Sequence, residues 1–117
     1  MGIRIAGTGS YVPEKILTNA DIEKLVDTND EWIRTRTGVE ERRIAAADET
    51  ASTMAIRAAE KALAAAGVDG RDIDAIVVAT ISPDYIFPNT AALVQHHFQC
   101  RQAFCFAHKL EACRNFL

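Results

Sequence analysis

The stretch ETASTMAIRAAEKALAAAGVDGRDIDAIVVATI, residues 49–81, decides the fold class of this chain. Its first part is rich in alanine, the residue with the highest helix propensity, and it stops at a glycine. This pattern predicts a helix over Asp48–Gly67. The last part, Asp72–Ile81, is short, apolar and β-branched, which is typical of an interior strand of a parallel sheet. A helix followed by such a strand indicates an α/β fold.

The segments on either side continue this alternation. Ile3–Val12 predicts a buried strand that runs into a turn, and NTAALVQHHF (89–98) predicts a further helix. QAFCF (102–106) predicts another short buried strand, and the proline-punctuated SPDYIFPNT (82–90) predicts the loop before the second helix. The order of strands and helices predicts a mixed or parallel sheet with packed helices.

The segment DTNDEWIRTRTGVEERR, residues 27–43, places the single tryptophan of the chain among four arginines and five acids. Thr28 and Glu31 have the spacing of a capping box, and Gly38 is suited to end a helix, so a helix is expected over Asn29–Thr37. The shorter TNADIEKL (18–25) predicts a helix before it, and VEERRIAA (39–46) an extended segment after it.

Trp32 and Arg36 are four residues apart on the predicted helix and therefore share a face. An indole beside a guanidinium can bind a planar heteroaromatic ring and neutralise a phosphate attached to it. The structural alternative is that Arg36 lies over Trp32 and shields the ring from water. Spacing alone leaves both interpretations open.

Composition excludes several classes of protein. At 117 residues the chain fits one domain, and 49% hydrophobic with 25% charged residues excludes wholesale disorder. The net charge of −3 favours neither nucleic acid nor an anionic membrane as a partner. The first residues contain neither a secretory signal nor a membrane span. An odd number of cysteines without a CxxC pair does not suit a disulfide framework, which favours a reducing cytoplasm.

The cysteines allow two further hypotheses. Cys113 lies near the end of a strand–turn–helix pattern, where a helix N-terminus could stabilise a thiolate nucleophile; alternatively it is a small buried apolar residue. A zinc knuckle could be formed by the soft ligands Cys100, Cys105, His108 and Cys113. That spacing matches no established zinc pattern, so no metal site is predicted. His96 and His97 are expected on a solvated helix face.

Several of these segments together resemble one family, β-ketoacyl-acyl carrier protein synthase III. GTGSYVPEKILTNADIEKLVDTNDEWIRTRTGVEERRIAAADETASTMA (7–55) resembles its N-terminal region. AIVVATISPDYIFPNT (75–90) resembles its next strand and the loop with an F-P-[ST] signature. The resemblance runs from about Ile3 to Phe106, and the DTNDEWIRTRTG block is its most specific part.

The resemblance implies a truncated thiolase-like fold, present as its N-terminal half, and an acyltransferase. The family condenses an acyl-CoA, usually acetyl-CoA, with malonyl-acyl carrier protein to start fatty-acid synthesis, and holds no permanent cofactor. Trp32 matches the tryptophan that stacks on the adenine of coenzyme A, and Arg36 the arginine near its phosphates. Thr28 and Thr37 match neighbouring contact positions. Phe87 matches the loop residue that reaches the acyl pocket of the neighbouring subunit, which implies a cytoplasmic homodimer.

The last residues depart from the family pattern. In the family the active-site cysteine is the C of the pattern F-D-x-x-x-A-C-x-G-F, whereas this chain reads FAHKLEACRNFL (106–117), which places Cys113 one residue late relative to Phe106. Residues 1–106 are therefore expected to form a partial thiolase-like domain and 107–117 a divergent tail at the position of the nucleophile helix. Cys113 is retained as the nucleophile. The family's catalytic histidine and asparagine lie further downstream, so the chain alone is expected to be inactive, and aggregation-prone or partly unfolded.

Two alternatives remain. A thiolase-fold acyltransferase of polyketide or hydroxymethylglutaryl type would share the fold but differ in its acyl pocket. A non-catalytic module that binds coenzyme A or zinc would lack acyl transfer altogether.

Overall fold

The computed structural model describes residues 2–108, which form two compact units. One unit is Val12–Glu49, and the other combines Thr50 onward with the first residues of the chain up to Tyr11. Within residues 2–108 the longest helix has 16 residues, and no helix meets the length and apolarity that a bilayer span requires.

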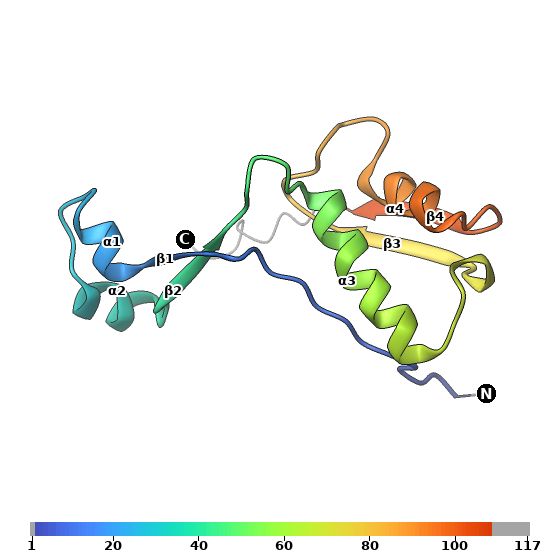
Figure 1. Ribbon diagram of the computed structural model, residues 1–117, viewed down its shortest axis with the longest axis horizontal. Coiled ribbons are helices and arrows are strands. Elements are labelled where there is room, and N and C mark those ends of the chain that lie inside the picture. Colours follow the sequence, from blue (N-terminus) through green and yellow to red (C-terminus); the bar gives the residue numbers. More distant parts are fainter. Residues whose placement is uncertain (1, 109–117) are drawn as a thin grey trace. The chain divides into compact units, whose positions relative to one another are not determined.

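The Val12–Glu49 unit consists of two short strands and two short helices. They are β1 (Lys15–Thr18), α1 (Asn19–Glu23), α2 (Asp30–Thr37) and β2 (Glu41–Ile44). The strands pair antiparallel, from Lys15 opposite Ile44 to Thr18 opposite Glu41, and Figure 1 shows them side by side. Both predicted helices and the extended segment after them are confirmed.

Local chemistry explains where α1 begins. The Thr18 hydroxyl accepts a hydrogen bond from the Asp21 backbone, and the Asp21 carboxylate accepts from the Thr18 backbone at 3.2 Å. This capping box satisfies two amide groups that lack partners within the helix. Thr18 is therefore the N-cap of α1.

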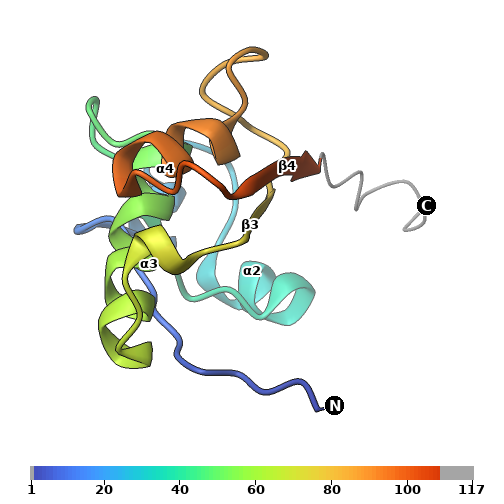
Figure 2. The same ribbon diagram turned by 90° about the vertical axis from the view of Figure 1, so that its right-hand side faces the viewer.

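The second unit is a strand–helix–strand crossover with one additional helix. Its elements are α3 (Ala51–Ala66), a 3-10 turn (Gly70–Asp72), β3 (Ala75–Ala79), α4 (Thr90–Phe98) and β4 (Phe104–His108). β3 and β4 are parallel, in register from Ala75 opposite Phe104 to Ala79 opposite His108. α4 connects them and packs on their sheet, with α3 beside it (Figure 2). The predicted helices and the parallel pairing are confirmed.

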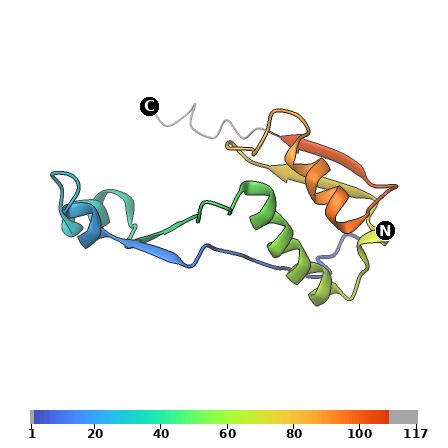
Figure 3. The same cartoon turned by 45° about the horizontal axis from the view of Figure 1, so that its top comes forward.

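The predicted buried strand over Ile3–Val12 is wrong. No strand is assigned in this segment, and Ile3 and Ile5 are 105% and 84% exposed. The backbone of residues 7–9 instead runs along α3 (Figure 3), where a Cβ at Gly7 would lie 2.6 Å from the carbonyl oxygen of Ala62. A strand requires a neighbouring strand to pair with, and none lies beside this segment in the described part of the chain.

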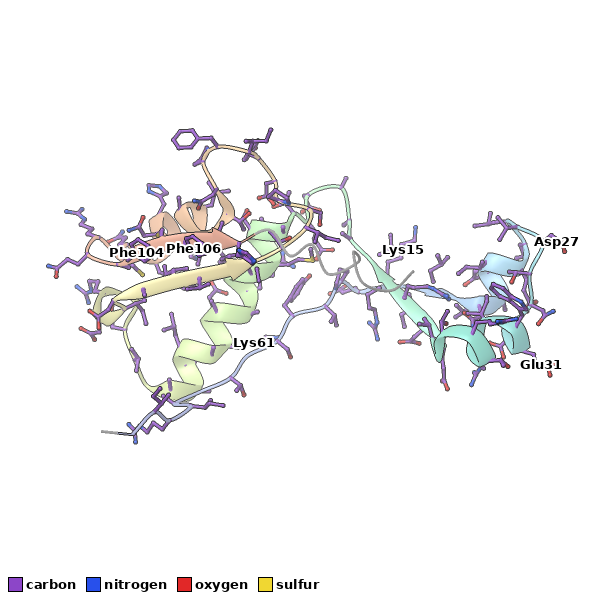
Figure 4. The ribbon with its side chains drawn as sticks, turned by 180° about the vertical axis from the view of Figure 1, so that it is seen from behind. Lys15, Asp27, Glu31, Lys61, Phe104 and Phe106 are labelled. Carbon is purple, nitrogen blue, oxygen red and sulfur yellow. The ribbon has the colours of Figure 1, made fainter. Side chains whose placement is uncertain are left out.

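The predicted burial of the two parallel strands is also wrong in the described residues. Helices cover one face of the β3–β4 sheet, so the side chains of the opposite face remain exposed. Val77 is 67% exposed, and Phe104 and Phe106 are 66% and 47% exposed. Figure 4 shows the two phenylalanines along β4. The small core of this unit lies on the helix-covered face, around Ala91, Val94, Cys100 and Ala103.

Candidate functional site

The helix α2 carries the tryptophan, and its ends are fixed by local interactions. The Asn29 side chain accepts a hydrogen bond from the Trp32 backbone at 2.8 Å, and Gly38 adopts the left-handed conformation with φ 70°. The capping box predicted for Thr28 and Glu31 is therefore wrong by one residue, because Asn29 occupies the N-cap position and its side-chain oxygen reaches the Trp32 amide three residues ahead. The Thr28 side chain is not needed for the cap.

Trp32 is 56% exposed although it is the largest apolar side chain of the unit. It lines a groove of about 490 Å³, here called the Trp32 groove. The groove is lined by Ile22, Val26, Asp27, Thr28, Asn29, Trp32, Ile33 and Arg42. Ile33, the next residue of α2, is 5% exposed and provides the buried side of the helix. The indole is therefore available to a planar ligand, and Thr28 lies on the wall of the same groove.

Arg36 is exposed and does not line the Trp32 groove. In residues 2–108, the cations that lie over an aromatic ring are Arg57 and Lys61, both over Tyr11, and none lies over Trp32. The alternative in which Arg36 shields the indole is therefore wrong. Arg36 also makes no hydrogen bond or ion pair with described residues, so its guanidinium is free to bind an anion.

Thr37 uses its hydroxyl within the protein. The Oγ1 atom donates to the Ile33 carbonyl at 2.7 Å and accepts from the Val39 backbone at 3.1 Å. Both interactions close the last turn of α2. Thr37 therefore stabilises the end of the helix, and its predicted role as a ligand contact is not tested by these contacts.

A network of polar side chains supports the groove from within the unit. Asn19 is 1% exposed, and its Nδ2 atom donates to Asp30 Oδ1 at 2.6 Å and to the Val39 carbonyl at 3.0 Å. Its Oδ1 atom accepts a hydrogen bond from Arg42 Nη1. The hydrogen bonds from Asn19, and then from Arg34, lower the pKa of Asp30. Asp30 is therefore ionised at neutral pH.

Asn19 and Arg42 were not predicted as site residues. The alternation of side chains in the extended segment ERRI (41–44) could have indicated that Arg42 and Arg43 point to opposite faces. Nothing in the sequence alone links Arg42 to an asparagine at position 19, because that contact depends on the antiparallel pairing of β1 with β2.

Phe87 lies in the loop between β3 and α4 and is 89% exposed, next to Ile86 at 99%. The Phe87–Pro88 peptide bond is cis. The loop is attached to the start of α3 by Asp84, whose carboxylate accepts from Thr50 Oγ1 at 2.9 Å and from the Ser52 backbone at 3.0 Å. An exposed aromatic on an anchored loop is consistent with a contact to a partner, and the structure of one chain does not test that contact.

The cysteine hypotheses have different outcomes. Cys113 lies outside the described residues. Cys100 is 1% exposed, and Cys105 Sγ donates to the Ala91 carbonyl at 3.7 Å. Burial raises the pKa of both thiols, so both are protonated at neutral pH. No group of three or more metal ligands is found in residues 2–108, so Cys100, Cys105 and His108 do not by themselves form a zinc site. His96 and His97 are exposed as expected.

Comparison with known proteins gives a consistent result. No family model matches the chain. It is 55% identical over all 117 residues to β-ketoacyl-[acyl-carrier-protein] synthase III of Chlamydia muridarum, and 52% identical over 117 residues to that of Bacillus pumilus. It spans 36% and 37% of these relatives. The chain resembles β-ketoacyl-[acyl-carrier-protein] synthase III. The prediction made from the DTNDEWIRTRTG block is thereby confirmed.

Solved structures support the same resemblance. The 3-oxoacyl-[acyl-carrier-protein] synthase III of Aquifex aeolicus matches with a TM-score of 0.88 and 47% identity over 93% of this chain and 35% of that one. The priming β-ketosynthase of the R1128 polyketide pathway matches with a TM-score of 0.86 and 36% identity, over 92% of this chain and 32% of its own. The predicted α/β, thiolase-like fold, present only in part, is confirmed: the chain spans about a third of the length of its relatives.

Proposed function

We propose that the protein represented by this chain is a β-ketoacyl-acyl carrier protein synthase III-type enzyme that condenses an acyl-CoA, in the first instance acetyl-CoA, with malonyl-acyl carrier protein. The observation that carries the proposal is the exposed indole of Trp32 on a groove, in a chain 55% identical over its whole length to a synthase of this type. Ligand sites are concave and are often lined by aromatic side chains, and Trp32 lines such a groove.

In the proposed site, Trp32 stacks on the adenine of coenzyme A, while Arg36 binds its phosphates. Thr28 contacts the coenzyme from the wall of the groove, and Thr37 contacts it from the end of α2. The free guanidinium of Arg36 and the absence of a cation over Trp32 within the described residues support this arrangement. Coenzyme A thioester is the substrate, and no metal or permanently bound cofactor is invoked.

The proposed reaction uses Cys113 as nucleophile. Its thiolate attacks the acyl-CoA carbonyl, the C–S bond to coenzyme A breaks, and the coenzyme leaves as a thiolate that takes up a proton. Malonyl-acyl carrier protein then loses carbon dioxide, and the resulting enolate attacks the acyl-enzyme. This forms the carbon–carbon bond and releases the cysteine. The second step requires hydrogen-bond donors for the developing oxyanion, which the family resemblance assigns to residues beyond the matched third.

Further parts of the proposal concern the whole protein. It is a cytoplasmic homodimer in which Phe87 reaches the acyl pocket of the neighbouring subunit, and it requires neither nucleic acid nor a membrane. Residues 1–106 form the partial thiolase-like domain and 107–117 a divergent tail. Since the chain spans 36% of a relative, it is proposed to be inactive alone.

The experiment is mass spectrometry of the complete protein after incubation with acetyl-CoA. An acetyl group on Cys113, followed by acetoacetyl-acyl carrier protein after addition of malonyl-acyl carrier protein, is the expected result. Acylation of another residue refutes the role of Cys113. No acylation and no condensation refute the enzymatic proposal and leave a non-catalytic module that binds coenzyme A.

A second candidate, a polyketide-priming synthase of the same fold, is favoured by the match to the R1128 priming enzyme. The same experiment separates the two. A preference for acyl-CoA chains longer than acetyl in the acylation step supports polyketide priming, and a preference for acetyl-CoA supports fatty-acid initiation.

A further inference from the structure

The Trp32 groove contains one cation, and it is not the arginine that spacing indicated. Arg42 of β2 lines the groove together with Trp32 and Thr28, whereas Arg36 does not. Arg42 is half-buried, while Arg36 is exposed. Any anion bound in the groove beside the indole therefore meets Arg42.

The position of Arg42 is fixed by a buried amide. Both Nδ2 protons of Asn19 are used, one by Asp30 Oδ1 and one by the Val39 carbonyl, and these two groups can only accept hydrogen bonds. The Asn19 amide cannot be flipped without opposing acceptor to acceptor, so its Oδ1 atom has to face a donor. Arg42 Nη1 is that donor. Asn19 is 1% exposed, so water has no access to replace this hydrogen bond, and its loss would leave a buried acceptor without a partner.

The charge of Arg42 is not neutralised within the described part of the chain. Two other arginines of this unit are paired, unlike Arg36 and Arg42: Arg34 Nε lies 2.8 Å from Asp30 Oδ2, and Arg43 Nη2 lies 3.3 Å from Glu41 Oε1. Arg42 has no ion pair in residues 2–108, and only Nη1 is used. A guanidinium carries five N–H donors, so most of its donors remain for a ligand.

The indole beside Arg42 indicates which kind of anion fits the groove. Carboxylates and phosphates can both accept two hydrogen bonds from one guanidinium, so Arg42 by itself does not distinguish them. Trp32 lines the same groove and can stack on a planar base, which favours the phosphate of a nucleotide. Asp27 also lines the groove, and Figure 4 shows Asp27 and Glu31 projecting outward from this unit.

We propose that Arg42 binds a phosphate group of the nucleotide whose base stacks on Trp32, and that Asn19 is the positioning residue that orients its guanidinium. This inference rests on the proposed function, since it takes the ligand to be an adenine nucleotide such as coenzyme A. It adds a second cation to the site, in a place that the spacing of Trp32 and Arg36 does not indicate.

The experiment uses Trp32 fluorescence, because the 117-residue chain has a single tryptophan. The chain is titrated with adenosine, with adenosine 3′,5′-bisphosphate and with coenzyme A. R42Q is expected to weaken binding of the bisphosphate about tenfold or more and to leave adenosine binding unchanged. The matched control R43Q, which removes an arginine on the opposite face of the same strand, is expected to bind like the wild type.

The outcomes are distinct. Wild-type affinity of R42Q for the bisphosphate overturns the inference while the proposed function stands. A wild-type chain that circular dichroism shows to be folded and light scattering shows to be free of aggregates, but whose fluorescence responds to neither the bisphosphate nor coenzyme A, contradicts the coenzyme A site of the proposed function.

Far-UV circular dichroism checks that R42Q is folded. A second measurement does not depend on any variant: in the wild type, the Arg42 Nε–H resonance in a ¹⁵N NMR spectrum is expected to shift with the bisphosphate and to stay in place with adenosine. The same shift with both ligands, or none with the bisphosphate, refutes phosphate binding by Arg42.

Discussion

Replacing Asp84 with asparagine tests how the loop that carries Phe87 is held. The Asp84 carboxylate spans from this loop to the first turn of α3, where it accepts hydrogen bonds from Thr50 Oγ1 and the Ser52 amide. Ser52 is 7% exposed, so its amide has little access to water. Asp84→Asn keeps the shape of the side chain but removes its charge and turns one acceptor into a donor.

Two contributions set the expected loss of stability in D84N. A negative charge at a helix N-terminus contributes about 0.3–1 kcal/mol, and a hydrogen bond to a charged group exceeds a neutral one by about 1 kcal/mol. Asp84 is partly exposed, and the Thr50 hydroxyl can rotate to accept from the new amide, which reduces the loss. We expect D84N to lower the free energy of unfolding by about 1–2 kcal/mol.

The assay is urea unfolding followed by circular dichroism, at a dilution where light scattering detects no self-association. Hydrogen exchange at the Ser52 amide is measured alongside and is expected to accelerate about tenfold. The control is D48N, because Asp48 is exposed and its side chain makes no hydrogen bond in the described residues. Equal stability of D84N and D48N, with unchanged exchange at Ser52, refutes the reasoning.

The same contact predicts a pH dependence. Burial alone would raise the pKa of Asp84, but the hydrogen bonds from Ser52 and Thr50 lower it below the ordinary value of 3.8. A carboxyl with a lowered pKa stabilises the folded state above its unfolded pKa, and this contribution is lost as the pH falls through the folded pKa. The difference in stability between wild type and D84N is therefore expected to be constant at neutral pH and to shrink below about pH 4. A difference that persists in acid contradicts an ionic origin.

Three further predictions follow from local features. Phe106→Ser is expected to reduce self-association of the chain without loss of helix, since the ring is 47% exposed on an uncovered sheet face; light scattering that does not fall would contradict this. Asn29→Ala removes the cap of α2 and is expected to cost about 1 kcal/mol in urea unfolding, against no loss for the neighbouring Thr28→Ala; equal losses would be contrary to the observed cap. Hydrogen bonds from the Thr18 side chain, and then Lys24, lower the pKa of Asp21 from 3.8 to about 2, so its NMR titration is expected well below the ordinary aspartate value, and a titration at the ordinary value would exclude the capping box.

The helices were predictable from the sequence because their ends depend on neighbouring residues. α3 ends at Gly67, whose φ of 65° is a conformation that glycine adopts without strain, and α1 begins at the capping residue Thr18. The cap of α2 shows the limit of this reasoning. Asn29 and Thr28 are both good caps, and pattern alone does not decide between adjacent candidates.

Burial and long-range contacts could not be predicted in the same way. The apolar residues of Ile3–Val12 and of the two parallel strands are side chains that could be buried, and whether they are buried depends on which other segments cover them. In residues 2–108 one face of the β3–β4 sheet is uncovered, so Val77 and Phe106 are exposed. The pattern of apolar residues in a strand does not show whether another segment packs against that strand.

The sequence by itself determined the helices, the parallel pairing and the family that the chain resembles, because these follow from local propensity and from extended motifs. Only the tertiary structure decided which cation lines the same groove as the indole. Trp32 and Arg36 are close in sequence, but the antiparallel pairing of β1 with β2 brings Arg42 to the buried Asn19, and so to the groove. The spacing of residues along one helix does not show which residues the pairing of two strands brings close together.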